Sequence, residues 1–280
     1  MGQSPFSPEK GAPPDFSKRP ATAMVKKDDR LFQETIMHTF YLPPGQWSGR
    51  LELSGAEAHH MGRVLRLHPG DEVLVLDGEG REALCRISAI GRQSALLNIV
   101  EEKRYPRPEA GVVLAVGWGK EARRGWILEK SVELEAAGLW FWQARRSQFP
   151  VPADAKETWH ASLVAGAKQC RNPWLPELRT LPGGVEELIR ASQDFEHRQV
   201  LLESGLPGQS FMSADVLGLP GKTLCVIGPE GGFTPEEAER LIDAGFQALS
   251  MGERVLRWET AAMMALGLHW WKRQHPGEPS

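Results

Sequence analysis

Two glycine-rich loops near the end of the chain constrain its fold most strongly, because each follows a short apolar run and precedes a helix signal. Residues 224–227 are continuously apolar, as in a strand buried on both faces of a parallel sheet. The loop at 228–232 contains proline and glycines, which allow a sharp turn and a close approach of main-chain amides to a ligand. Thr234 and Glu237 then predict a capping box, at the start of a helix that Gly245 ends.

The second loop repeats this order, with a strand at 248–251, a turn at Gly252 and an apolar helix through 261–268. Neither loop carries a P-loop or a GxGxxG phosphate motif. The carboxylate of Glu230 would also repel a pyrophosphate. A ligand without phosphates, bound by main-chain groups, therefore fits better. For either loop alone, an ordinary strand-to-helix turn explains the pattern equally well.

The chain from residue 109 to residue 275 alternates strands and helices, which predicts an α/β domain with a mostly parallel sheet covered by helices. Besides the two loop cycles, the predicted strands are residues 112–116, 139–142 and 200–202, and the predicted helices are residues 126–137, 155–169 and 186–191. The helix after Thr234 has a predicted apolar stripe of Ala238, Leu241 and Ile242. A polar, proline-broken segment at 101–108 marks the expected domain boundary.

Residues 38–105 show short alternating segments and turn signals, which predict a small β-barrel. Its expected strands include 72–76, 83–87 and 94–100, with a hairpin loop at 77–80. Residues 1–37 combine prolines with charges and few large apolar groups, so we expect a disordered extension there. An alternative is that translation starts at Met37.

Composition excludes several classes of protein. The chain of 280 residues has 41% apolar residues, 25% charged residues and a formal net charge of −3, so an RNA-binding surface must be a local patch. Cys85, Cys170 and Cys225 are widely separated and lack CxxC spacing, which predicts free thiols in a reducing cytosol and no metal site. No run is long enough to span a membrane, and we expect a cytoplasmic protein.

Five motifs carry a resemblance to a known family. They are HHMGRVLRLHPGDEVLVLDGEG at 59–80, GKEARRGWILEKSVEL at 119–134, KQCRNPWLPEL at 168–178, IGPEGGF at 227–233 and MGERVLRWETAAMMAL at 251–266. In this order they resemble the RsmE family of 16S ribosomal RNA (uracil-N3)-methyltransferases, within the SPOUT superfamily. Lys168, where that family often has an acid, and Trp258, where it has a smaller residue, depart from the pattern.

The resemblance implies a SPOUT-type C-terminal domain with a trefoil knot, after an N-terminal PUA-like or OB-like β-barrel that helps to bind RNA. It also implies a homodimer and an S-adenosyl-L-methionine site in the knotted loops. The implied cofactor-binding residues are Leu202, Glu203, Ile227, Gly228, Pro229, Glu230, Gly231, Gly232, Met251, Gly252, Arg254, Val255 and Leu256.

Methylation of uracil N3 requires loss of its proton, which a carboxylate could accept while an arginine stabilises the resulting anion. On the matched motifs, the candidates for charge stabilisation are Arg171, Arg254 and Arg257, and the candidate bases are Glu133, Glu230 and Glu259. Each carboxylate has a competing structural role. Glu259 could stabilise a helix dipole, Glu230 could order its loop, and Glu133 could pair with Lys130.

The expected partner is 16S ribosomal RNA or the small ribosomal subunit. Arg63 and Arg66, three residues apart, could meet phosphates from one face of a helical turn, and Lys120, Arg123 and Arg124 could do so before the first helix of the larger domain. A solvated basic surface explains both groups about as well. A non-catalytic RNA-binding protein of the same fold remains an alternative, as does an unrelated α/β enzyme with a nucleotide cofactor. Binding of the methyl donor distinguishes among them.

Overall fold

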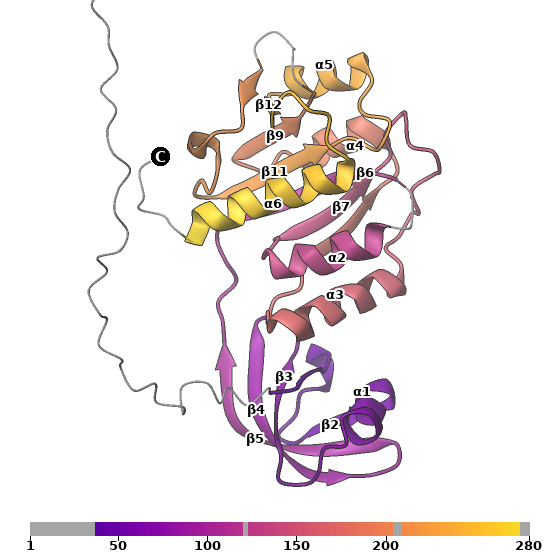
Figure 1. Cartoon of the computed structure of the whole chain (residues 1–280), viewed down its shortest axis with the longest axis vertical. Helices are drawn as coiled ribbons and strands as arrows, with labels where there is room; N and C mark the ends of the chain where they lie inside the picture. The colour runs from indigo at the N-terminus through magenta and orange to yellow at the C-terminus, as the bar shows by residue number, and fades with distance from the viewer. Residues whose placement is uncertain (1–36, 120–122, 204–208, 275–280) are drawn as a thin grey trace, which may run out of the picture. The chain divides into compact units, whose positions relative to one another are not determined.

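A computed structural model describes residues 37–119, 123–203 and 209–274 (Figure 1). The predicted disorder of residues 1–36 and the predicted RNA contact of Lys120 lie outside these residues. No helix among the described residues is long and apolar enough to cross a membrane.

The first part of the described chain forms a curled five-stranded sheet (Figure 1). Its strands are β1 (Thr39–Tyr41), β2 (Leu51–Ser54), β3 (Glu72–Leu76), β4 (Arg81–Ile90) and β5 (Ser94–Arg104), in the spatial order β1-β3-β4-β5-β2. The strands predicted at 72–76, 83–87 and 94–100 and the hairpin between β3 and β4 are therefore confirmed. Register shifts between β4 and β5 help the sheet to curl around a core that includes Phe40, Leu53 and Val75.

Sequence reasoning missed β1 and β2, which are only three and four residues long. It also treated the charged residues 101–104 as linker, whereas they continue β5 to Arg104. The α1 helix (Gly55–His59) and a π-helical turn (His60–Val64) follow β2. That turn ends before Arg66, whose φ of 55° is left-handed. The prediction that Arg63 and Arg66 share one helical face is therefore wrong.

The second part of the chain forms a seven-stranded sheet in which every described pairing is parallel. Its strands are β6 (Gly111–Gly117), β7 (Gly138–Trp142), β8 (Glu177–Leu181), β9 (His197–Leu201), β10 (Ser210–Phe211), β11 (Lys222–Ile227) and β12 (Gln247–Ser250), in the order β10-β12-β9-β11-β6-β7-β8. This confirms the predicted α/β class. Sequence reasoning missed β8 and β10, which lie at the two edges of the sheet. Exposed and half-buried residues alternate along most of β8, and both residues of β10 are exposed.

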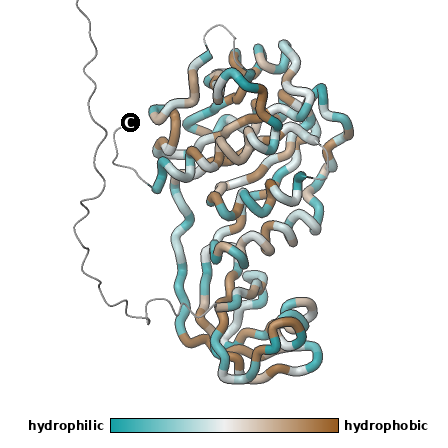
Figure 2. The backbone as a smooth tube through the Cα atoms, in the orientation of Figure 1, coloured by the Kyte–Doolittle hydropathy of each residue, from teal (hydrophilic) through white to brown (hydrophobic). Residues whose placement is uncertain are grey.

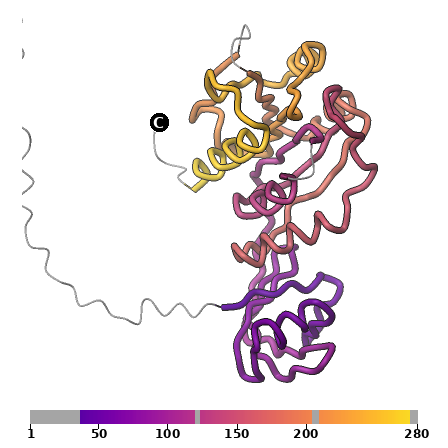
Figure 3. The backbone as a smooth tube through the Cα atoms, turned by 45° about the vertical axis from the view of Figure 1, so that its right-hand side comes forward, coloured from indigo at the N-terminus to yellow at the C-terminus, as the bar shows by residue number. Residues whose placement is uncertain are grey.

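Helices cover both faces of this sheet (Figures 1 and 3). One face carries α2 (Arg124–Glu133), α3 (Glu157–Cys170) and α6 (Trp258–Gln274), and the other carries α4 (Gly184–Ala191) and α5 (Pro235–Asp243). In β6, Leu114 faces the first set of helices and Ala115 the second. Because both faces are covered, β6 has no polar side chain and β11 is apolar from Leu224 to Ile227, as the brown segments of Figure 2 show.

The α5 helix begins with the predicted capping box between Thr234 and Glu237, which is confirmed. Its predicted apolar stripe is only partly correct: Leu241 is buried, whereas Ile242 is 41% exposed. The α6 helix is apolar around much of its circumference, and Met264 and Trp271 remain exposed. The trefoil knot stays a prediction from the resemblance.

Candidate active site

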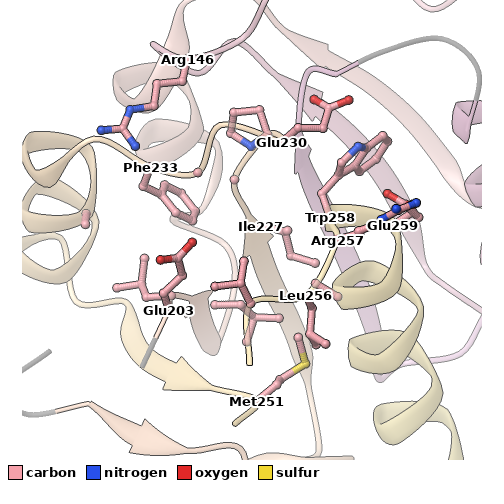
Figure 4. A pocket seen from close by; sticks show the side chains of 18 of the residues that line it. Arg146, Glu203, Ile227, Glu230, Phe233, Met251, Leu256, Arg257, Trp258 and Glu259 are labelled. Carbon is pink, nitrogen blue, oxygen red and sulfur yellow. The ribbon is translucent and has the colours of Figure 1, made fainter. Parts of the chain in front are cut away.

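A cavity of about 930 Å³ opens where the loops after β9, β11 and β12 meet (Figure 4). All three loops follow the carboxyl ends of parallel strands, so they lie at the same edge of the sheet, where open α/β sheets bind their ligands. Every residue predicted to bind the cofactor lines this cavity except Gly231. Sequence reasoning missed Arg146, Phe233 and Trp258 as part of its wall.

The loop after β11 packs directly against the end of β6. A Cβ atom on Gly117 would overlap the main chain at Gly228 and Pro229, and one on Gly119 would lie 2.5 Å from Oε2 of Glu230. The indole of Trp142 donates a hydrogen bond to the carbonyl of Ile227 (3.1 Å). Backbone and a buried indole therefore fix the loop that forms one wall of the cavity.

Gly231 does not itself line the cavity but lies against Arg146, which does. Its carbonyl accepts a hydrogen bond from Nη1 of Arg146 (2.9 Å), and a Cβ atom at this position would lie 3.0 Å from Cβ of Arg146. An aspartate at position 231 would thus meet the side chain of Arg146.

Glu237 connects the loop after β11 to the loop after β7. Its buried carboxylate accepts hydrogen bonds from the main-chain N–H groups of Thr234 (3.0 Å) and Arg145 (2.7 Å). The first bond belongs to the capping box, and the second reaches the loop after β7. The sequence signalled the cap, but nothing in it signalled the bond to the distant loop.

Charged side chains concentrate at one side of the cavity, where Glu230, Arg257 and Glu259 lie around Trp258 (Figure 4). Glu259 is 7% exposed and forms an ion pair with Arg123. Glu230 and Arg257 are exposed at the cavity wall. On the opposite side, the carboxylate of Glu203 points into the cavity near Phe233 (Figure 4).

Families of known proteins match both parts of the chain. Residues 106–270 match the RNA methyltransferase domain and residues 53–100 match the RNA methyltransferase PUA domain. The ribosomal RNA small subunit methyltransferase E of Bacillus subtilis is 30% identical over 223 residues, which cover 76% of this chain and 87% of that protein. The chain belongs to this RNA methyltransferase family. The resemblance carried by the five motifs is thereby confirmed.

Solved structures agree with this assignment. A methyltransferase of Legionella pneumophila in complex with S-adenosylmethionine superposes with a TM-score of 0.73 at 28% identity, covering 83% of this chain and 96% of that one. The ribosomal RNA small subunit methyltransferase E of Neisseria gonorrhoeae bound to S-adenosyl methionine gives a TM-score of 0.69 at 25% identity, covering 82% and 95%. The predicted SPOUT-type fold class is confirmed.

Within this methyltransferase, two predicted catalytic residues lie outside the cavity. Glu133 is in the last turn of α2, where it pairs with Lys130 (2.5 Å), and Arg171 is the left-handed cap at the end of α3. Each helix starts after a strand and runs back toward the opposite edge of the sheet, so its end lies far from the strand carboxyl ends. The structure therefore contradicts a role for either residue in the cavity of its own chain.

The predicted RNA-binding arginines differ in their exposure to solvent. Arg63, Arg66 and Arg123 are exposed, although Arg123 pairs with Glu259. Arg124 is 5% exposed, with its guanidinium 3.8 Å from the ring of Trp118. This burial contradicts phosphate binding by Arg124.

The described residues include all three cysteines. All three thiols are free there, as expected. Burial raises the pKa of Cys85 and of Cys225 to about 12, which leaves both unreactive. The described part of the chain contains no cluster of His, Cys, Asp and Glu that could hold a metal ion.

Proposed function

We propose that this chain transfers a methyl group from S-adenosylmethionine to N3 of a uridine in small-subunit ribosomal RNA. The observation that carries the proposal is the cavity built by three loops at the carboxyl edge of a parallel sheet, in a chain of the RNA methyltransferase family. Its proposed partner is 16S ribosomal RNA or the assembled small subunit, and its proposed place of action is the cytoplasm.

The cavity suits this methyl donor. Its volume lies within the roughly 300–1,000 Å³ usual for small-molecule sites. Ile227, Met251 and Leu256 supply an apolar lining, and the loop backbones supply hydrogen-bonding groups. Glu203 would accept hydrogen bonds from ribose hydroxyls or an ammonium group. No phosphate has to be accommodated, which agrees with the missing phosphate motifs.

Bound S-adenosylmethionine supplies an activated methyl group on a positive sulfur, so the chain mainly has to orient the acceptor and manage one proton. We assign the proton of uracil N3 to Glu230, because Glu230 is exposed at the cavity wall whereas Glu259 is buried. Arg257 would stabilise the negative charge that develops on the base. The exposed Arg63, in the π-helical turn after α1, and the exposed Arg66, two residues beyond that turn, would contact phosphates.

Methyl transfer to RNA tests this proposal. Purified protein should incorporate labelled methyl from S-adenosylmethionine into small-subunit RNA, or into subunits that lack the mark, and nucleoside mass spectrometry should identify 3-methyluridine. Donor binding without incorporation into either substrate would reject the proposal. RNA binding without donor binding would instead indicate a non-catalytic RNA-binding protein.

We also propose that the chain is a homodimer. Trp126 of α2 and Met264 and Trp271 of α6 are 46%, 40% and 50% exposed, an apolar area that a second copy could cover. Light scattering coupled to gel filtration should give twice the mass of one chain, and Trp271→Glu should shift it toward the monomer. A monomeric wild-type protein would refute the dimer but not the reaction.

A further inference from the structure

Arg124 occupies a place where a positive charge is costly. It is 5% exposed and lies in the first turn of α2, where the helix dipole disfavours cations. Removing a guanidinium from water costs several kcal/mol unless other interactions replace the lost hydration. Packing alone would be served as well by an apolar side chain.

The surroundings of Arg124 hold its guanidinium in one orientation. The group lies 3.8 Å from the ring centroid of Trp118 and 5.4 Å from that of Trp159, so two aromatic faces offset part of the desolvation. Trp118 is itself fixed, because its main-chain N–H donates to the carbonyl of Trp142 (2.9 Å) and its ring packs on Phe141. In this orientation, Nη2 of Arg124 donates to the carbonyl oxygen of Gly119 (3.3 Å).

Gly119 connects Arg124 to the cavity. The carboxylate of Glu230 lies against the α-carbon of Gly119, so that a Cβ atom there would be 2.5 Å from Oε2, 2.8 Å from Cδ and 2.9 Å from Oε1. Any shift of Gly119 must therefore move the carboxylate of Glu230 or leave a gap behind it. Glu230 in turn lies on the cavity wall beside Trp258 (Figure 4).

We infer that Arg124 is a positioning residue, which sets the place of the Glu230 carboxylate in the cavity through the carbonyl and α-carbon of Gly119. This inference rests on the proposed function, because it assigns Arg124 to the step in which Glu230 accepts the N3 proton. A buried arginine in an aromatic site is suited to this role because its planar group forms a directed hydrogen bond that an apolar side chain cannot replace.

Arg124→Met tests the inference, since methionine fills a similar volume without the charge or the donor. The turnover number should fall about tenfold or more, as expected for a misplaced catalytic group, while the Kd of the donor measured by calorimetry changes less than about threefold. Arg124→Lys, which keeps a cation and a donor, should recover part of the turnover. Arg179→Met is the matched control: it removes a guanidinium 5.0 Å from the ring of Trp140, on a strand that contributes nothing to the cavity, and should leave turnover unchanged.

A double-mutant cycle separates positioning from general destabilisation. In a Glu230→Gln background, Arg124→Met should cause almost no further loss of turnover, because the group that it positions is already gone. Additive losses, or unchanged turnover in a folded Arg124→Met protein, would overturn the inference. If Arg124→Met does not fold, Arg124→Lys provides the test. Wild-type turnover in the lysine variant overturns the inference. A loss of turnover that disappears in the Glu230→Gln background supports it. A wild-type protein that does not methylate RNA would instead reject the proposed function.

Discussion

Individual buried polar residues hold the parts of the fold that surround the cavity, and His269 shows this most clearly. Its imidazole, in the middle of α6, is fully buried. Nδ1 accepts a hydrogen bond from the N–H of Gly218 (3.3 Å), which leaves Nε2 as the donor to the side-chain oxygen of Gln199 (3.0 Å). Gln199 then donates to the carbonyl of Val216 (2.7 Å). This chain of bonds joins α6 to β9 and to the short helical turn Ala214–Val216, and it requires neutral histidine.

The stability of the protein should consequently fall in mild acid. Burial, followed by the charges of Arg273 and His197, lowers the pKa of His269 from 6.5 to about 4. The unfolded chain therefore binds a proton at higher pH than the folded chain, so the stabilisation is complete above pH 6.5 and is lost as the pH falls toward 4. From pH 7 to pH 4 the His269 contribution to the free energy of unfolding should decrease by about 3 kcal/mol.

Urea unfolding at several pH values measures this effect. His269→Gln, whose amide can offer one acceptor and one donor, should lose less stability between pH 7 and pH 4 than the wild type does. Parallel pH profiles for the two proteins would contradict the assignment.

Glu237 is a second buried polar residue that holds a loop beside the cavity. Glu237→Ala leaves the N–H groups of Thr234 and Arg145 without their carboxylate partner, so the free energy of unfolding should fall by about 1–3 kcal/mol. Because the cavity loop ends at this cap, the donor Kd should rise as well. The neighbouring Glu236→Gln is the control, since Glu236 is exposed and interacts with Arg145 and Arg146 through charge, whereas Glu237 accepts a hydrogen bond from the main chain of Arg145. Equal effects of the two substitutions on thermal unfolding and on calorimetric donor binding would argue against a role of the Glu237 hydrogen bonds in holding the loop.

At the scale of elements, the contact of β6 with the loop after β11 decides the shape of the cavity. Gly117→Ala would push a methyl group into the main chain at Gly228 and Pro229, where no flexible side-chain end can yield. We expect a loss of about 1–3 kcal/mol in the free energy of unfolding and at least about a tenfold rise in donor Kd.

Gly267→Ala is the control for this substitution. Gly267 lies in the interior of α6, and a Cβ atom there meets nothing within 4 Å. Alanine should therefore stabilise the helix by up to about 1 kcal/mol and leave donor binding unchanged. Thermal unfolding and calorimetry measure both variants. Normal donor affinity in Gly117→Ala would show that the loop tolerates displacement.

At the scale of the whole molecule, the two sheets are joined by reciprocal contacts. The hairpin between β3 and β4 exchanges hydrogen bonds with the segment after α3: Gly80 donates to the carbonyl of Pro173 (2.9 Å), and Leu175 donates to that of Gly78 (2.9 Å). Nζ of Lys168 also lies 2.6 Å from Oε1 of Glu57, with both side chains 22% exposed. Lys168 is one of the positions where the chain departs from the resembled motifs, and the ion pair gives it a structural role.

Reversing the charge of Lys168 should weaken this connection. Lys168→Glu places two carboxylates together, and we expect a loss of about 1–3 kcal/mol in the free energy of unfolding and a higher KM for RNA. The donor Kd should stay the same, because neither residue lines the cavity. The double variant Glu57→Lys with Lys168→Glu should restore both properties. A harmless Lys168→Glu, or a loss that the double variant does not recover, would show that the ion pair does not stabilise this connection.

Much of this architecture followed from the sequence, because the relevant signals are local. The apolar run of β11, the capping box of α5 and the turn between β3 and β4 each depend on residues close together in the chain. The loops that line the cavity were likewise recognisable from glycines next to strands. Short edge strands such as β8 and β10 gave too little apolar pattern to be recognised.

What the tertiary structure alone decided is which side chains meet. Arg171 and Glu133 lie on matched motifs but end up at helix ends that point away from the cavity, whereas Arg146 reaches Gly231 across 85 positions of the sequence. Arg124 carries the same charge as its neighbour Arg123 and yet lies buried against Trp118. Sequence patterns report the conformation of a segment, but the burial and the partners of a side chain depend on residues far away in the chain, which only the packed fold brings together.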